Sequence, residues 1–311
     1  MAEITINDVA FVPQVVEAWV SEDLRKKSAI LNSSAVIVGF EGIPKNGYRV
    51  AVPVWGGLTG EAQDAGQCLV PRGMNSAVAY AQIQRAGEAI SVNKLVNDIG
   101  GTDPLAQLTS KLATFWERQI QGDLVASITG SYQALQDSVT QLSVTAGATN
   151  FASIASALAL YGEYMQDEYT IVMHSQVYAK LLAAEATQFR PGADVNRFMT
   201  YAGMQVIIDN SVPVTGTGAG AVYTTYLIKS GSFVYGEQTL GNRALEADRD
   251  ILCDDDLVTS RKTYIIHPNA ASFTLDSLTK ATRVQLANPA NWAAGTTDVE
   301  NYGVRVLRAP L

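Results

Sequence analysis

His174 and His267 are the two histidines of this sequence, and histidine is the side chain best suited to acid–base chemistry near neutral pH. Neither lies beside a nucleophile or carboxylate in a catalytic pattern. The sequence also contains no Gly-x-Ser-x-Gly elbow, His-Glu-x-x-His motif or P-loop. We therefore expect structural histidines, each with one ring nitrogen bonded to the backbone, and we predict no catalytic residues.

The glycine-rich run 216–220 is a candidate dinucleotide-binding loop. Such a loop opens a helix, whose N-terminal amides bind the pyrophosphate. Here the β-branched and aromatic residues 222–226 follow, and they predict a strand. We expect a flexible hairpin or subunit-contact loop and no cofactor. An NAD-dependent oxidoreductase stays the alternative of a different class, and thermal stabilisation by the cofactor would support it.

The acidic run 254–256 is the candidate for a cation site. Calcium loops place their ligands at alternate positions with a glycine turn and a terminal Glu, and this pattern is absent. We interpret the run as a solvated acidic turn and predict no metal site. At a subunit junction the same acids could still recruit an ion. Cys68 and Cys253 lack the spacing of a disulfide framework or a metal site, so we expect both to be reduced.

The composition favours a large buried core and excludes several classes of protein. Of the 311 residues, 47% are hydrophobic and 17% charged, and the net charge is −8. That balance is opposite to the one needed for binding DNA by phosphate neutralisation. The N-terminus has acids where a signal peptide needs bases, and no segment is apolar enough to span a bilayer. We expect a soluble protein made in the cytoplasm, with no membrane partner.

The first part of the chain predicts an arm, a helix and a strand. Pro13 suits a first helical turn, and apolar residues at three- and four-residue steps predict a helix over 13–27. The arm 1–12 before it is apolar and β-prone, and needs a partner to become ordered. Residues 35–40 predict a short buried strand.

Two alternating segments then predict a long two-stranded ribbon. In the first, 48–54, Pro53 cannot donate to a ladder, which places the strand at an edge or on an isolated ribbon. In the second, 77–82, Val78 and Tyr80 share one side and alanines the other. About twenty residues rich in Gly, Asp and Gln separate them and predict an elaborate tip. Because such a ribbon is marginal alone, we expect it to lie on a neighbour.

A long helix follows the ribbon. Pro104 suits the first helical position, and apolar residues recur at helical spacing as far as Ile128. Gly130 predicts the stop. A helix over 104–129 would be about 39 Å long and would act as a girder.

The remainder predicts α/β structure. Apolar spacing predicts helices over 151–161 and 175–185. Strands are predicted at 169–173, 204–208, 222–228, 262–266 and 303–307, and residues 235–245 are expected to be irregular to extended.

This order of elements resembles the Hong Kong 97-type capsid subunit of tailed bacteriophages. Residues 43–55 resemble the entry into its extended loop, and 172–181 a strand-then-helix unit of its axial domain. Residues 203–213 resemble the strand that leads to its axis loop, and 246–268 the return to its peripheral domain. The likeness covers nearly the whole chain and rests on the order of these segments.

The resemblance implies an α+β fold with an N-arm, an extended β-ribbon loop, a long spine helix, a peripheral domain and an axial domain. The implied division is 1–34 (N-terminal arm and helix), 35–95 (strand and extended loop), 96–145 (spine helix, peripheral domain), 146–260 (axial domain) and 261–311 (return to the peripheral domain and C-terminal tail).

The implied function is structural and not enzymatic: a major capsid subunit that assembles as hexamers and pentamers into an icosahedral shell packaging double-stranded phage DNA. Implied partners are further copies of the chain, a scaffolding protein, a portal and a decoration protein, with DNA enclosed without sequence-specific binding. The implied location is the virion, after assembly in the host cytoplasm. The chain has no room for a scaffolding segment before Phe11, so we expect a separate scaffolding protein or an already processed chain. We predict no Lys–Asn cross-link.

Trp55, Arg72 and Arg85, on or beside the ribbon, are the residues we expect at contacts between subunits. A role within the monomer is the alternative for each. The nearest alternative function is the shell of an encapsulin-type cellular nanocompartment, which shares the fold and encloses enzyme cargo.

Overall fold

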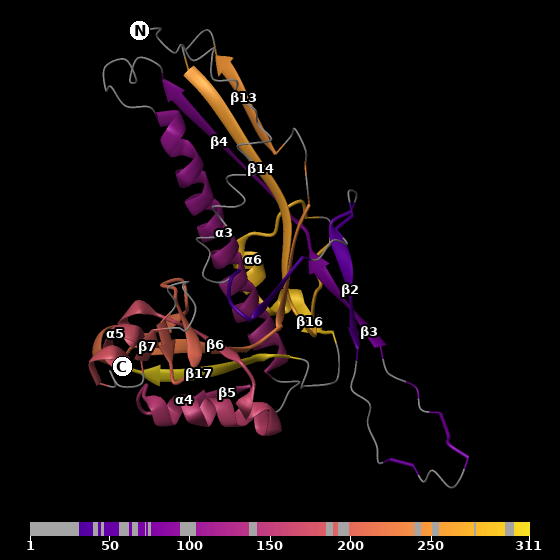
Figure 1. Cartoon of the computed structure of the whole chain (residues 1–311), viewed down its shortest axis with the longest axis vertical. Coiled ribbons are helices and arrows are strands. Elements are labelled where there is room, and N and C mark those ends of the chain that lie inside the picture. The colour runs from indigo at the N-terminus through magenta and orange to yellow at the C-terminus, as the bar shows by residue number, and fades with distance from the viewer. Residues whose placement is uncertain are drawn as a thin grey trace.

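The computed structural model places a long sheet and helix α3 at one end, a second sheet at the other, and a narrow ribbon extending to the side (Figure 1). The arm 1–12 and the helix predicted over 13–27 lie outside the described residues. The described ranges are 31–39, 43–44, 47–55, 62–63, 68–71, 73, 76–93, 104–136, 142–184, 189–191, 199–238, 240, 244–250, 255–276, 278–295 and 302–311.

The long sheet is built around one strand of 14 residues, β14 (Asp255–Pro268). One edge of β14 pairs with β4 (Gln84–Asn93). Its other edge pairs with β13 (Leu245–Asp250) and, further along, with β12 (Phe233–Gln238). The short strand β1 (Val36–Val38) joins β12 in parallel and forms an edge. The sheet is thus held together by β14, because three other strands pair directly with it.

Two local predictions for this sheet are wrong. The strand predicted as buried over 35–40 exposes Ile37 and Val38, because β1 lies at the edge of the sheet. The acidic residues Asp255 and Asp256 do not lie in a turn, since they begin β14 and pair with Asn93 and Val92 of β4. The strand predicted over 262–266 is confirmed and is longer than expected.

Helix α3 (Pro104–Leu135) lies along one face of the long sheet and begins where the sequence predicts (Figure 1). It continues past Gly130, so the predicted stop is wrong. A Cβ atom at Gly130 would overlap the carbonyl oxygen of Leu286 and lie 2.6 Å from the indole nitrogen of Trp292. The glycine therefore permits close packing inside the helix and does not end it.

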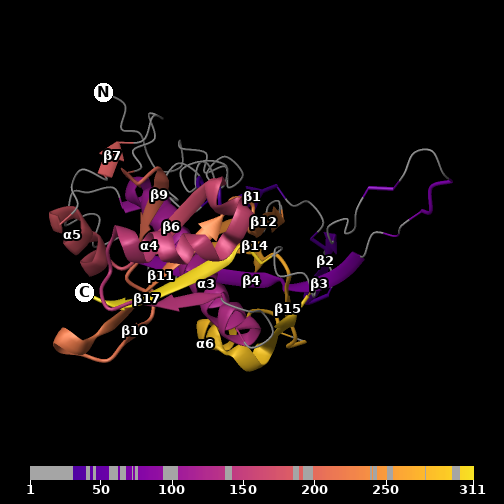
Figure 2. The same ribbon diagram turned by 90° about the horizontal axis from the view of Figure 1, so that it is seen from below.

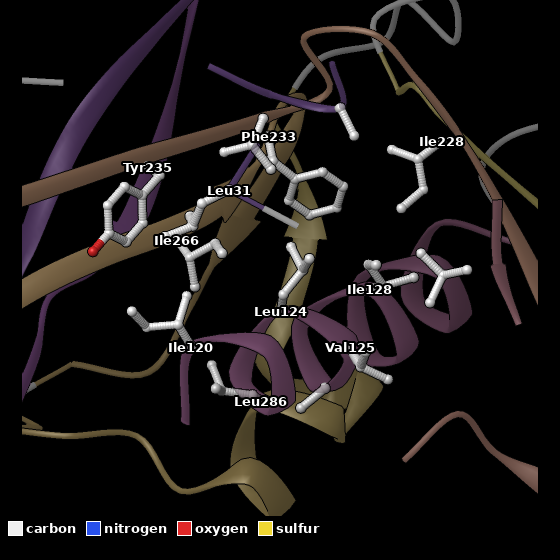
Figure 3. Close-up of a cluster of buried hydrophobic side chains, with 14 of the residues drawn as sticks. Leu31, Ile120, Leu124, Val125, Ile128, Ile228, Phe233, Tyr235, Ile266 and Leu286 are labelled. Atoms are coloured by element: carbon white, nitrogen blue, oxygen red, sulfur yellow. The ribbon is translucent and has the colours of Figure 1, made fainter. Parts of the chain in front are cut away.

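The main hydrophobic core lies between α3 and the long sheet (Figure 3). Apolar residues at three- and four-residue steps on α3 meet the side chains of the sheet strands and of the segment before β1. Full burial of one such side chain stabilises the fold by roughly 1.5–3 kcal/mol. The labelled members are Leu31, Ile120, Leu124, Val125, Ile128, Ile228, Phe233, Tyr235, Ile266 and Leu286.

The second sheet has eight strands, in the order β5-β17-β11-β6-β9-β8-β7, with β10 paired to β11. Its helices confirm the two helices predicted in this region, although the first continues as a 3-10 helix. The strands are β5 (Ser143–Thr145), β6 (Tyr169–Met173), β7 (Phe189–Pro191), β8 (Met199–Tyr201), β9 (Met204–Ile208), β10 (Val214–Thr215), β11 (Val222–Lys229) and β17 (Val304–Pro310). The helices are α4 (Phe151–Leu158), η2 (Ala159–Gln166), α5 (Ser175–Ala184) and η4 (Gly218–Gly220).

Strand β17 lies inside the second sheet although it comes from the C-terminal region. It pairs antiparallel with β11 along its whole length and parallel with β5 on the other side. Residues 233–250, by contrast, contribute β12 and β13 to the long sheet. The predicted division assigns residues 146–260 to the axial domain and 261–311 to the return to the peripheral domain. The sheets to which β12, β13 and β17 belong do not follow this boundary. The five-part domain division itself stays a prediction.

The ribbon consists of β2 (Arg49–Trp55) and β3 (Ser76–Gln82), which pair antiparallel with each other and form a sheet of their own. This confirms the prediction made from Pro53. A small group of elements covers the root of the ribbon and the outer side of α3 (Figure 2). It contains β15 (Ala271–Phe273), α6 (Arg283–Ala287), η6 (Pro289–Asn291) and β16 (Trp292–Ala294).

Candidate assembly surfaces

Among the residues that the structure describes, neither histidine lies in an arrangement suited to catalysis. His267 is fully buried, its Nε2 atom lies 2.7 Å from the carbonyl oxygen of Ala271, and burial lowers its pKa to about 4. At His174, Nδ1 accepts a hydrogen bond from the backbone N–H of Gln176, and the ring packs edge-on against Tyr223. Both histidines thus bond to the backbone, as the sequence predicts.

The glycine run 216–220 forms part of the connection between β10 and β11, with η4 inside it. It leads directly into a strand, as predicted, so the arrangement lacks the helix N-terminus that would bind a pyrophosphate. Within the described residues there is no group of three or more His, Cys, Asp or Glu side chains suited to a metal ion. In the same part of the chain, no helix is both long and apolar enough to cross a membrane.

The root of the ribbon is fixed to the body of the molecule by polar contacts. Arg49 forms an ion pair of 2.9 Å with Asp276, and the backbone N–H of Tyr80 donates to the hydroxyl of Ser272. Gln82 donates to the carbonyl oxygen of Leu278 at 2.8 Å. These contacts orient the ribbon before any partner is present, so less conformational entropy is lost when it binds one.

The two faces of the ribbon differ in exposure. On the inner face, Ala79 and Ala81 are fully buried, which agrees with the alternation in the sequence. On the outer face, Val78 is 52% exposed, and Tyr80 is exposed as well. The Arg49 guanidinium lies 5.0 Å from the centre of the Tyr80 ring and limits its movement. The outer face is therefore an apolar surface that is already ordered.

The described part of the ribbon tip is also apolar. Leu69 and Val70 are 65% and 68% exposed, and Cys68 beside them is free and exposed. The side-chain amide of Gln63 donates to the carbonyl oxygen of Val70 and accepts from its N–H, at 2.7 Å each. This reciprocal pair braces the exposed segment. Large apolar side chains on a projecting ribbon are typical of a contact with another molecule.

The structure places the three predicted contact residues differently. Trp55 is the last residue of β2, in register with Ser76, and its side chain lies outside the described set. Arg72 lies outside the described residues. Arg85 is half-buried in β4, pairs with Thr263 of β14 and donates its N–H to the carbonyl oxygen of Thr279. The expectation that these three residues contact a neighbouring subunit stays a prediction.

Other exposed apolar residues were not predicted from the sequence. Leu69 and Val70 lie in the segment that we interpreted only as an elaborate tip. Ile37 and Val38 on β1 were interpreted as buried. The sequence does not distinguish an exposed edge strand such as β1 from a buried strand, because both contain a short continuous apolar run.

The two sheets are joined by a tight junction near the β11–β12 turn. Ser232 donates to the carbonyl oxygen of Gly303, and the backbone N–H of Lys229 donates to the same oxygen at 2.8 Å. The Tyr161 hydroxyl donates to the carbonyl oxygens of Leu227 and Gly303. These main-chain carbonyls therefore hold the start of the connection that leads from the second sheet to β12 of the long sheet.

Comparison with known proteins agrees with this architecture. No family model matches the chain. It is 29% identical over 306 residues, covering 94% of each chain, to the major capsid protein of Bacillus phage SPP1. Its fold resembles the capsid of Ralstonia phage GP4 (TM-score 0.61, 11% identity, 89% of this chain and 87% of that one). It also resembles the head structure of Helicobacter pylori phage KHP40 (TM-score 0.58, 11% identity, the same coverage).

The proteins named here are phage capsid components, and they give no support to the nanocompartment or oxidoreductase alternatives. The order of ribbon, long helix and two sheets is the one that the resemblance in the sequence implied. The chain is therefore similar in sequence to a phage major capsid protein and in fold to the capsids of tailed bacteriophages, and its fold is of the Hong Kong 97 type.

Proposed function

We propose that copies of this chain associate as hexamers and pentamers around the second sheet and close into an icosahedral shell. The observation that carries this proposal is the braced ribbon, whose root is fixed by Arg49 and Gln82 while its outer face and tip expose Val78 and Val70. Such an arm leaves apolar surface in water in a monomer and removes it from water when it lies on a neighbour. Modest contacts repeated in every subunit make a stable closed shell.

The shell would enclose double-stranded DNA without sequence-specific contacts. A net charge of −8 suits a container that does not bind its contents tightly along the whole wall. We further propose a separate scaffolding protein, a portal and a decoration protein as partners. Assembly would take place in the host cytoplasm and the finished shell would form part of the virion.

Negative-stain electron microscopy of the purified protein, alone and with its scaffolding protein, tests the proposal. Closed shells, tubes or six-fold capsomers are the expected products. A small monodisperse particle under every condition, scaffolding protein included, would contradict it. A shell whose interior holds enzyme and no DNA after expression in infected cells would contradict the packaging function alone.

A further inference from the structure

The outer side of α3 and the neighbouring helix α6 form a basic surface that the shell contacts proposed above do not use. We call it the α3–α6 face. In Figure 2, α6 lies at one border of the molecule next to α3, with no other labelled element beyond it. The members of the face are exposed, and most are cationic. They are Lys111, Arg118, Lys280, Arg283 and Val284.

Arg283 joins the two helices into one surface. Its guanidinium donates to the carbonyl oxygen of Arg118 at 3.1 Å and to the side chain of Gln119 at 3.0 Å, and its Nε lies 3.3 Å from Asp123. It lies close against α3 because Gly122 has no side chain; a Cβ atom there would be 2.6 Å from Nη2. The guanidinium of Arg283 is thus held at a fixed position between the two helices.

The acid that contacts Arg283 is hidden from the surface of the face. Asp123 is buried, and burial raises its pKa, while hydrogen bonds from Tyr264 and Arg283 act in the opposite direction. Within the described part of α3, the exposed charged side chains are Lys111 and Arg118. They are seven residues apart, which is about 10.5 Å along the helix. A chain with a net charge of −8 therefore presents cations to solvent along this helix.

The face also carries an apolar side chain among its cations. Val284 on α6 is 80% exposed, and Pro289 and Ala290 of η6 are exposed a short distance along the chain. A polyanion such as DNA would engage the cations and leave Val284 in water. A protein helix with acids on one side and aliphatic residues beside them would neutralise the cations and bury Val284.

We propose that the α3–α6 face binds an acidic amphipathic helix of a partner protein, and that in assembly this partner is the scaffolding protein. The identification of the partner rests on the proposed shell function, but the binding chemistry does not. Charge complementarity would guide the encounter and contact with Val284 would favour an aliphatic partner. Since attraction between exposed charges weakens with ionic strength, the partner could leave once assembly is complete.

A synthetic fluorescent helix built of Leu–Glu heptads is the probe, and fluorescence anisotropy with the full-length chain measures its affinity. Arg118→Gln should weaken binding about threefold at low salt. Val284→Ser should weaken it about fivefold or more at any salt concentration. Both side chains are exposed, so both variants should fold. Lys180→Gln and Leu182→Ser on α5 are the matched controls, because they remove an exposed cation and an exposed aliphatic residue elsewhere.

Three results would overturn the inference. One is helix binding that none of the α3–α6 variants changes. Another is a short DNA duplex that binds more tightly than the helix, with an affinity that Arg118→Gln lowers and Val284→Ser leaves unchanged. The third is failure of the variants to form shells without any partner, which would make the face a contact between copies. If the unmodified chain forms no shells while the helix still binds with the expected variant effects, the shell function fails and the binding site does not.

Discussion

The imidazole of His267 stacks on the indole of Trp292, with ring centres 5.7 Å apart and an interplanar angle of 22°. The stack lies where β14, β15 and β16 meet, and Trp292 also donates to the carbonyl oxygen of Leu286 at 2.6 Å. A neutral histidine is thus enclosed where the long sheet, the ribbon root and α6 come together. Protonation would place a charge in this dry environment.

The buried histidine predicts a loss of stability in acid. Its pKa is about 4 in the folded chain against 6.5 for a free side chain, so the unfolded state binds the proton more readily between these values. The free energy of unfolding should therefore fall as the pH drops from 6.5 to 4, by on the order of 3 kcal/mol from this residue. Urea unfolding across that range, on the unmodified chain and on His267→Phe, measures the difference. Identical pH slopes in the two proteins would refute the assignment.

Gly130→Ala should destabilise the fold even though alanine is the better helix former. The gain of about 1 kcal/mol in helix propensity is outweighed by the overlap with Leu286 and Trp292, which forces α6 away from α3. A net loss of about 1–3 kcal/mol is expected from thermal and denaturant unfolding. Gly147→Ala is the matched control, because nothing lies within 4 Å of the added atom and little change is expected there. Equal effects at the two positions would argue against the packing explanation.

Arg305→Lys should lower the free energy of unfolding although it keeps the charge. The Arg305 side chain is 4% exposed, its Nη1 donates to the carbonyl oxygens of Tyr302 and Val304, and its guanidinium lies 4.5 Å from the centre of the Tyr161 ring. A lysine cannot supply the same planar set of donors, which leaves carbonyls unpaired at a cost of about 1–3 kcal/mol.

Arg308→Lys on the same strand is the comparison for this prediction. Arg308 is only half-buried and lies 5.4 Å from the centre of the Tyr132 ring, so a smaller loss in the free energy of unfolding is expected. Denaturant unfolding of both variants ranks the two effects. A larger loss at Arg308 would contradict the role given to the carbonyl contacts of Arg305.

Val78→Asp should prevent shell formation without weakening the monomer. The residue is 52% exposed on the outer face of the ribbon, so a carboxylate is solvated in the free chain but desolvated against a neighbour. The melting temperature should stay within about 2 °C of the original, because surface substitutions change stability by about 0.5 kcal/mol or less. Electron microscopy and sedimentation should show loss of shells. Val78→Thr, which keeps the shape, should still assemble, and shells formed by Val78→Asp would count against a contact at this face.

The sequence predicted the ribbon and most of the second sheet because their signals are local. The alternation in 48–54 and 77–82 and the apolar spacing in 175–185 each depend only on residues close together in the chain. The prediction of where α3 ends failed because the reason for the glycine is not local. Gly130 predicts a helix stop by its type, and the elements that require a glycine there, α6 and β16, lie more than 150 residues further along the chain.

The assembly surfaces were predicted less completely than the fold. Exposure of Val78 and Tyr80 depends on which face of the ribbon meets Ser272 and Gly295, and the alternating pattern alone does not say which face is covered. The α3–α6 face could not be predicted at all. Arg118 becomes a neighbour of Arg283 only through the packing of α6 on Gly122.

The position of β17 has a consequence for the order of events during synthesis. This strand leaves the ribosome after β5 and β11, the two strands between which it inserts. Until it arrives, the edges of both strands that it will cover remain open, and the buried residues Tyr226 and Val306 have not yet paired across the β11–β17 ladder. A nascent or truncated subunit therefore lacks a finished second sheet and cannot compete for places in a growing shell. Only a subunit whose translation has been completed can therefore form the whole second sheet.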